Sequence, residues 1–220
     1  MKAFNFIILI MGVLVSCASG PVPKERTHTL YGMIYDGDNR PVNDVKIHVD
    51  GDYKAASDVH GRFVIPNMKP NREYHISAEK EQHEKTSMDI FHADPSSVLY
   101  IHLFSADQLM AGAEEAIKKK DWLRAETFLE RAGQAGGAYA PISYLRGVLE
   151  FYKDRYAEAL SVLLDLAEKE KNAPHVYLFI ADLYEYYIND REEAQRFLAK
   201  FLELRYDPEA ESRLKKLEGI

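Results

Sequence analysis

The sequence has little cysteine, little tryptophan and no long apolar stretch. Cys17 is the one cysteine among 220 residues, so no internal disulfide can form and Cys17 has no structural role to fill. The longest apolar run, Ala3 to Val15, covers about 13 residues and is broken by Asn5. A membrane-spanning helix needs roughly 20 residues. The run therefore suits the hydrophobic region of an export signal better than a membrane span.

Positive charge is also in short supply. The chain carries 28 Lys and Arg against 35 Asp and Glu, for a net charge of −7. Both halves are acidic: residues 27–104 hold 8 basic and 12 acidic side chains, and residues 105–220 hold 17 and 22. Because nucleic-acid binding uses a basic surface, this balance argues against a nucleic-acid partner.

The N-terminus combines an export signal with a lipidation motif. Lys2 supplies positive charge before the apolar run, which ends in Leu14-Val15-Ser16-Cys17. This ending resembles the lipobox of bacterial lipoproteins. The resemblance implies that residues 1–16 are a signal peptide and that Cys17 is the acylated first residue of the mature chain, held at a membrane by its acyl chains. The alternative is an ordinary secretory signal with a chance cysteine.

A small, polar, proline-bearing segment follows. Residues 17–26 have the composition of a tether, which proline stiffens. Ala18 stands where enterobacterial lipoproteins of the inner membrane carry aspartate, so the resemblance implies an outer-membrane anchor facing the periplasm. The expected location is the bacterial cell envelope.

Residues 27–104 show the two-residue alternation of β-strands. Val45, Ile47 and Val49 take one face, while Lys46 and His48 take the other. Gly, Asn and Asp residues separate the runs, as turns require. The pattern predicts a seven-stranded antiparallel β-sandwich. Its strands are expected at residues 28–36, 43–49, 53–57, 61–65, 73–79, 86–91 and 98–104.

Three motifs of this half occur together. They are a first strand containing Gly32, the Pro-Val pair at 41–42, and Asp58-Val-His-Gly61-Arg-Phe63. The combination resembles the carboxypeptidase regulatory-like family, whose members are transthyretin-like sandwiches. Gly61 is expected to adopt a positive φ, Asp58 to cap the turn with its carboxylate, and Phe63 to fill the core. The family's module has no catalytic residues, so the resemblance implies no peptidase activity.

Beyond residue 105 the apolar period changes from 2 to 3.6, which marks a domain boundary and the start of helices. Small residues recur there at a fixed spacing. They are Ala113, Gly147 and Ala181, which are 34 apart, and Ala125, Ala159 and Ala194, which are 34 and 35 apart. The spacing resembles the tetratricopeptide (TPR) repeat, in which small residues let two helices approach closely. The alternative is a generic helical bundle.

The resemblance implies an all-α TPR solenoid of about three repeats. We expect these at residues 106–139, 140–173 and 174–207, closed by a capping helix at 208–217. The third unit is one residue longer, and the extra residue is expected in its turn. The complete prediction is a two-domain α+β chain, divided into 27–104 and 105–220.

No catalytic or metal-binding constellation emerges. The glycine-rich stretch 131–137 follows a helix, so it indicates a helix end and linker rather than a phosphate loop. Seven of the eight histidines lie in the β half, spread evenly, which favours solvated positions over a metal site or a pH switch. They are His28, His48, His60, His75, His83, His92 and His102. The sequence therefore predicts no enzyme, no metal and no cofactor.

In TPR proteins, the first helix of each hairpin lines a groove. Carried over to this chain, the resemblance implies a partner-binding groove that is rich in aromatic side chains. Its members are Met110, Glu114, Ile117, Tyr144, Val148, Phe151, Tyr152, Leu178, Asp182, Glu185 and Tyr186. The alternative is that these aromatic rings pack between helices.

Two functions of different class follow. The first is a membrane-anchored adaptor without catalysis, which binds a protein or peptide partner in the groove. The second is an accessory lipoprotein of a transporter, which holds a small hydrophobic molecule in the helical half. Fold alone does not separate them.

Overall fold

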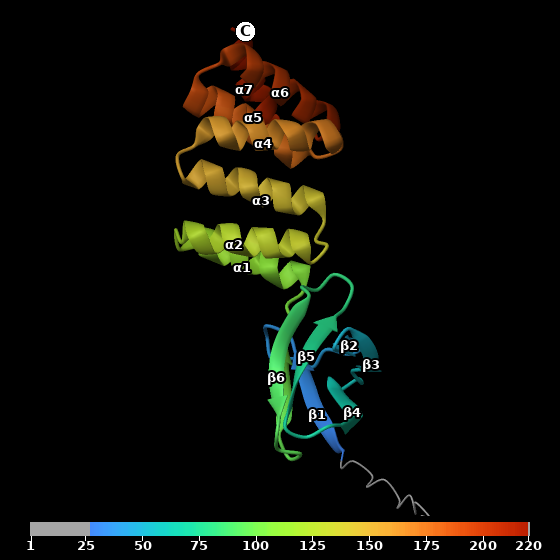
Figure 1. Ribbon diagram of the computed structural model, residues 1–220. Helices are drawn as coiled ribbons and strands as arrows, with labels where there is room; N and C mark the ends of the chain where they lie inside the picture. Colours follow the sequence, from blue (N-terminus) through green and yellow to red (C-terminus); the bar gives the residue numbers. More distant parts are fainter. Residues whose placement is uncertain (1–26, 220) are drawn as a thin grey trace, which may run out of the picture.

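The computed structural model describes residues 27–219. Within this range a β half is followed by a helical half, and Figure 1 shows the helices stacked beyond one end of the strands. The fold is α+β, as the change of period near residue 105 predicts. The proposed signal peptide (1–16), Cys17 and the tether (17–26) lie outside the described residues.

Seven strands make up the described β half, and most of them alternate between buried and exposed residues; β3, which has no buried residue, does not. In β1, for example, Leu30 and Ile34 are buried whereas Tyr31 is half exposed. The strands are β1 (His28–Tyr35), β2 (Lys46–Val49), β3 (Asp52–Ala56), β4 (Arg62–Met68), β5 (Arg72–Glu79), β6 (Thr86–His92) and β7 (Val98–His102).

The strands form two sheets, ordered β4-β1-β7 and β3-β2-β5-β6. The first sheet is mixed, because β7 runs parallel to β1 and aligns Val98 with Tyr31. The expectation of an entirely antiparallel sandwich is therefore wrong at this pair. The connection explains the difference: β6 belongs to the second sheet, so the chain crosses between sheets before β7. A strand that arrives by such a crossover, rather than by a tight hairpin, is free to pair in parallel.

One hydrophobic core fills the space between the sheets, and Ile34, Ile47 and Ile76 are fully buried in it. Phe63 is buried too, and its ring lies against the backbone of β1. A Cβ atom on residue 32 would lie 2.0 Å from Phe63 Cζ. Only glycine fits that position, which accounts for the glycine of the first strand.

The turn before β4 has the predicted chemistry. Gly61 adopts a φ of +72°. The Asp58 carboxylate accepts hydrogen bonds from the backbone N–H groups of His60 and Arg62, each at 2.9 Å. These bonds hold the pKa of Asp58 below its ordinary value, with the Arg62 backbone N–H as the largest cause. The carboxylate cap and the left-handed glycine are both confirmed.

Helices occupy the second half from Ala106 onward. They pair as antiparallel hairpins, α1 with α2, α3 with α4 and α5 with α6, with α7 packed on α6. The bounds are α1 (Ala106–Lys118), α2 (Trp122–Gln134), α3 (Tyr139–Tyr152), α4 (Tyr156–Lys169), α5 (Pro174–Asp182), the π-helical segment η1 (Leu183–Ile188), α6 (Arg191–Leu204) and α7 (Pro208–Glu218). This is a TPR-like arrangement of helical hairpins.

The small residues stand where the helices of a hairpin cross. Ala113, Ala125, Ala159 and Ala181 are all fully buried. A Cβ on residue 147 would lie 2.8 Å from the Leu163 side chain, so glycine is needed there for α3 and α4 to meet. Close approach of backbones thus explains the 34-residue series.

The extra residue of the third unit lies in a helix, not in the turn. Lys120, Asp154 and Asn189 hold the same left-handed position just before the second helix of each hairpin, and they are 34 and 35 apart. Ala181 still keeps the 34-residue spacing, so the insertion falls between Ala181 and Asn189. That segment contains η1, whose wider π turn absorbs one residue. The expectation of a longer turn is wrong.

Polar contacts fasten the first hairpin to the β half. The Arg131 guanidinium donates to both carboxylate oxygens of Glu84, at 2.8–2.9 Å, and its Cζ lies 5.4 Å from the centre of the Phe104 ring. The side chain of Gln108 donates to Asp36 and Asp38, at 3.0 and 3.1 Å. These contacts link α1 and α2 to loops of both sheets.

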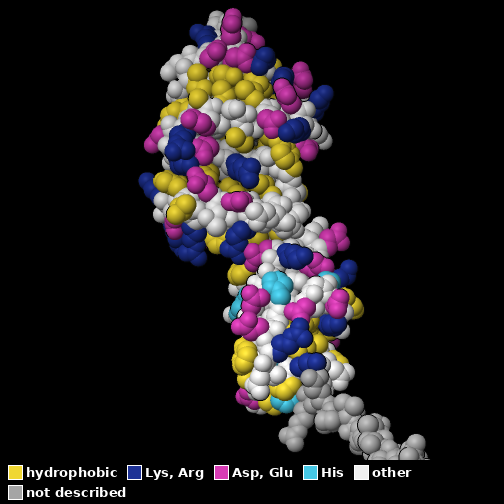
Figure 2. All heavy atoms as spheres, viewed as in Figure 1, with side chains coloured by type: hydrophobic (Ala, Val, Ile, Leu, Met, Phe, Trp, Pro, Cys, Tyr) yellow, Lys and Arg dark blue, Asp and Glu magenta, His cyan; other side chains and the backbone are white. Residues whose placement is uncertain are grey.

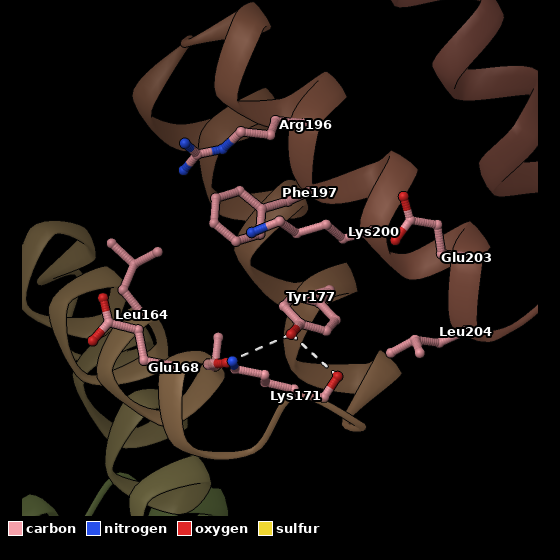
Figure 3. A pocket seen from close by; sticks show the side chains of 10 residues that line it. Leu164, Glu168, Lys171, Tyr177, Arg196, Phe197, Lys200, Glu203 and Leu204 are labelled. Carbon is pink, nitrogen blue, oxygen red and sulfur yellow. Dashed lines mark hydrogen bonds between the residues drawn. The ribbon is translucent and has the colours of Figure 1, made fainter.

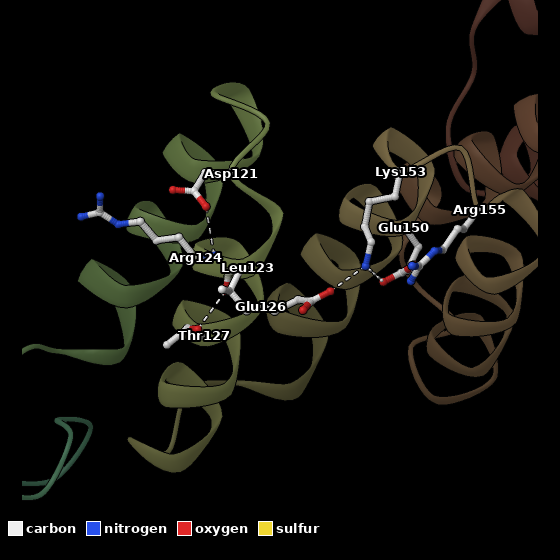
Figure 4. Close-up of polar contacts among 8 residues, drawn as sticks. All are labelled: Asp121, Leu123, Arg124, Glu126, Thr127, Glu150, Lys153 and Arg155. Carbon is white, nitrogen blue, oxygen red and sulfur yellow. Dashed lines mark hydrogen bonds and ion pairs between the residues drawn. The ribbon is translucent and has the colours of Figure 1, made fainter.

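A second polar cluster joins the first and second hairpins (Figure 4). Lys153 is nearly buried and donates to Glu126 of α2, at 2.6 Å, and to Glu150 of α3, at 3.1 Å. Arg155 also reaches Glu150, at 3.3 Å. The hydrogen bond from Lys153 to Glu126 is the main reason why the pKa of Lys153 is raised.

Candidate functional site

The first helices of the three hairpins line a groove. It consists of two adjoining hollows of about 580 and 420 Å³, which share Tyr144 and His175. The first is lined by Asp107, Met110, Ala111, Glu114, Ala140, Pro141, Tyr144, Leu145, Leu166, Glu170, Asn172, Ala173, His175 and Val176. The second is lined by Tyr144, Val148, Phe151, Tyr152, His175, Leu178, Phe179 and Asp182. We refer to the two together as the groove.

Most of the groove residues expected from the sequence lie in these hollows. α1 contributes Met110 and Glu114, α3 contributes Tyr144, Val148, Phe151 and Tyr152, and α5 contributes Leu178 and Asp182. The helical spacing of three and four residues brings them onto one face of each helix.

Three of the expected residues lie elsewhere. Ile117 is only 4% exposed and packs in the core between α1 and α2. Glu185 and Tyr186 belong to η1, where Arg213 of α7 contacts both: its guanidinium donates to Glu185 at 2.7 Å and lies 5.2 Å from the centre of the Tyr186 ring. α7 thus lies against Glu185 and Tyr186, the expected groove residues nearest the C-terminus.

Two further rows of residues that the TPR resemblance did not predict line the groove. The first row lies one helical turn before Met110, Tyr144 and Leu178 and consists of Asp107, Pro141 and His175. The second row lies one turn before Glu114, Val148 and Asp182 and consists of Ala111, Leu145 and Phe179. Within each row the residues are 34 apart. The repeat period could have revealed both rows, had the lining face been extended by one helical turn.

Aromatic rings in the groove hold one another in place. The Tyr144 ring lies 5.0 Å from the His175 ring and 6.1 Å from the Phe179 ring, and Phe151 lies 5.4 Å from Phe179. These edge-to-face contacts have the geometry that aromatic pairs prefer. Burial raises the pKa of Tyr144, with a smaller contribution from the negative charge of Asp182. The rings therefore both pack between helices and form the floor of the groove.

The charge in the groove has one sign. Asp107, Glu114, Glu170 and Asp182 line it, and among the described residues no lysine or arginine does. Burial raises the pKa of Asp182, an effect that the neighbouring Arg213 guanidinium opposes. On the face shown in Figure 2, acidic and basic side chains are interspersed over the helical half.

A third hollow, of about 560 Å³, lies between α4, α5 and α6 (Figure 3). Tyr177 and Phe197 contribute to its apolar part, and the Tyr177 hydroxyl donates to the backbone oxygen of Lys171 at 3.2 Å. Its charged side chains have both signs: Lys171, Arg196 and Lys200 against Glu168 and Glu203. This mixture contrasts with the groove, where the aspartate and glutamate side chains are not accompanied by lysine or arginine from the described residues.

Metal and membrane features can be stated for residues 27–219. This part of the chain contains no group of three or more His, Cys, Asp or Glu side chains placed to hold a metal ion. None of its helices has both the length and the apolar character that crossing a bilayer requires.

His92 differs from its expected solvated position. It is 2% exposed, neither ring nitrogen has a hydrogen-bond partner among residues 27–219, and its ring lies 5.9 Å from that of His28. Burial lowers the pKa of His92, and the nearby His28 lowers it further. The sequence did not reveal this pair, because His28 in β1 and His92 in β6 are far apart in sequence and come together only in the folded chain.

No protein-family model matches the chain, and no curated protein matches its sequence. Solved structures do match. The TPR domain of Arabidopsis OM64 has 20% identity and a TM-score of 0.44, with 52% of this chain and 94% of that chain covered. The first TPR domain of human RPAP3 has 18% identity and a TM-score of 0.45, with coverages of 52% and 90%. PcrH of Pseudomonas aeruginosa, in complex with the chaperone-binding region of PopB, has 16% identity and a TM-score of 0.42, with coverages of 52% and 92%.

Proposed function

We propose that this protein is a non-catalytic adaptor that binds a protein or peptide partner in the groove. One observation carries the proposal: three successive first helices place aromatic and aliphatic side chains side by side in a continuous, partly exposed groove. Tyr152 is 53% exposed at its rim, while Tyr144 is held by neighbouring rings. Rigid, partly exposed aromatic side chains are the usual anchors of protein interfaces.

The alternative is a small hydrophobic ligand. Such ligands occupy pockets that bury most of their surface. The groove has exposed acidic and aromatic side chains on its rim, including Glu114 and Tyr152. This open form favours an extended or helical segment of another chain.

Site-specific photo-crosslinking in cells tests the adaptor function. A photoreactive residue replaces Val148, at the floor of the groove, or Leu123, which is 75% exposed on α2 and lies outside it. We expect a defined adduct from position 148 that is weakened by Tyr144→Ala and absent from position 123. Equal labelling from both positions, or none from position 148, would contradict the proposal.

The membrane anchor is part of the same proposal. The lipobox-like ending at Cys17 and the tether 17–26 support an envelope lipoprotein, held at the outer membrane and facing the periplasm. In this arrangement the regulatory-like sandwich of residues 27–104 spaces the TPR repeats of residues 105–220 from the membrane. Cys17→Ser should release the chain from membranes in detergent-free fractionation while circular dichroism stays unchanged. Continued membrane association of a folded C17S protein would refute the anchor.

A further inference from the structure

We infer that the groove selects a partner segment that pairs a cationic side chain, lysine or arginine, with a neighbouring aromatic or aliphatic side chain. The inference rests on the proposed adaptor function and adds the chemistry of the partner. It follows from three observations: the sign of the charge in the groove, an arginine already bound at one repeat, and the position of the apolar floor.

The first observation is the unbalanced negative charge. Asp107, Glu114 and Glu170 surround the first hollow, and none of them forms an ion pair with another described residue. Lys119 and Lys169 lie nearby in sequence but pair with Glu115 and Asp165. A cationic side chain entering the hollow would meet three carboxylates and no lysine or arginine from the described residues, whereas an acidic segment would be repelled.

The second observation is that one repeat already binds an arginine. Asp182 accepts a hydrogen bond from Arg213 of α7 at 2.7 Å, and Arg213 is also paired with Glu185 and placed over the Tyr186 ring. Glu114 holds the same repeat position as Asp182, two periods of 34 residues earlier. α7 therefore presents to the third repeat the kind of side chain that the first repeat is built to accept from outside.

The third observation is the apolar surface beside the acidic one. Val148, Phe151 and Leu178 line the second hollow, and Tyr144 forms part of both. A segment lying along the groove would thus set its cation among the carboxylates of the first hollow and its apolar side chain in the second. The hollow of Figure 3 offers no equivalent, because it mixes Lys171 and Lys200 with Glu168 and Glu203.

Fluorescence anisotropy with three matched peptides tests the inference. The first alternates arginine with leucine and contains one tryptophan. The second has citrulline, an uncharged analogue, in place of arginine, and the third has glutamate. We expect the full soluble chain (Cys17→Ser) to bind the arginine peptide at least about tenfold more tightly than the citrulline peptide, with the glutamate peptide weakest. Binding should weaken as salt is added.

Matched charge reversals localise the effect. Glu114→Lys, in the groove, should weaken binding of the arginine peptide by about tenfold, the size expected when an attractive charge becomes repulsive. Glu203→Lys changes the net charge equally but lies in the hollow of Figure 3, and it should leave the affinity unchanged. Circular dichroism confirms that both variants are folded.

The outcomes separate this inference from the adaptor function. If the citrulline or glutamate peptide binds as well as the arginine peptide, and Tyr144→Ala weakens all of them, the groove binds peptides but the charge preference is wrong. If Glu114→Lys and Glu203→Lys weaken binding of the arginine peptide equally, the preference comes from the net charge of the protein and not from the groove, and the inference is overturned. If no peptide binds and the crosslinker at position 148 captures nothing, the adaptor function itself falls.

Discussion

The two halves of the chain bury apolar surface through contacts of very different range. In the β half, residue 31 pairs with residue 98, and a single core spans both sheets. In the helical half each helix packs chiefly on its neighbour in sequence, and the core divides into separate clusters. A core assembled from distant segments is lost as a unit, whereas an array of local units can lose one part at a time. The following predictions test that difference.

The largest effect is expected from Gly61→Val in the β half. A Cβ at position 61 would lie 2.4 Å from the backbone oxygen of Ile34, and the φ of +72° is unfavourable for a β-branched residue. Backbone strain and steric overlap together should cost about 4 kcal/mol. Hydrogen exchange should show all seven strands losing protection together while the helices keep theirs. Gly133→Ala, in open space on α2, is the control and should not destabilise. Local loss confined to the turn would refute a single cooperative β unit.

Leu163→Ala applies a comparable change to the array. Leu163 is fully buried against Gly147, and removing such a side chain costs about 3 kcal/mol. We expect α3, α4 and the hairpin after them to lose hydrogen-exchange protection first, while α1 and α2 stay protected by their contacts with the β half. Leu123→Ala, at an exposed position, should change little. Uniform loss over all helices would show that the array is as cooperative as the sandwich.

Lys153→Met should have a smaller effect, because it removes polar contacts between two hairpins and preserves the aliphatic stem. We expect a loss of about 1–2 kcal/mol near neutral pH in urea unfolding. The pKa of Lys153 is raised in the folded state, so its contribution is present below the ordinary lysine value and disappears as pH rises through the folded value. The difference between wild type and variant should therefore shrink above about pH 10.5. Lys119→Met, which breaks an exposed pair with Glu115, is the control.

The smallest effect concerns His92 and is confined to acid. Its pKa is lowered in the folded state, so the neutral ring supports folding above about pH 6.5 and stability is lost as pH falls below that value. His92→Phe keeps a ring but removes the titrating nitrogens, and should recover about 1 kcal/mol at about pH 5 in urea unfolding. His60→Phe changes an exposed histidine and should leave the pH dependence intact. Acid sensitivity that survives in His92→Phe would assign it to other groups.

Sequence predicted most reliably what local backbone geometry dictates. The left-handed turn at Gly61, the cap from Asp58 and the buried small residues of the hairpins depend on neighbours within one turn or one repeat, so their spacing carries the information. The parallel pairing of β7 and the burial of His92 depend on segments that meet only after folding. The contact of Arg213 with Asp182 is of the same kind, since α7 lies about 30 residues away in sequence.

The third repeat shows where spacing alone falls short. The interval of 35 residues between Ala159 and Ala194 reveals one additional residue, but an interval does not say where that residue is accommodated. Turns accept insertions more readily than helices, so the turn was the natural expectation. Here the helix accepted it, because a π turn needs one residue more than an α turn and keeps the backbone bonded.

That π segment gives the chain an unusual tolerance to change in length. Deleting one residue from a packed helix ordinarily rotates every later side chain by about 100° and ruins its contacts. Within 183–188 the same deletion would restore a regular α-helix and return the third hairpin to the register of the first two. Residues 183–188 are thus a position at which one residue can be gained or lost inside a helix while the rest of the hairpin keeps its contacts.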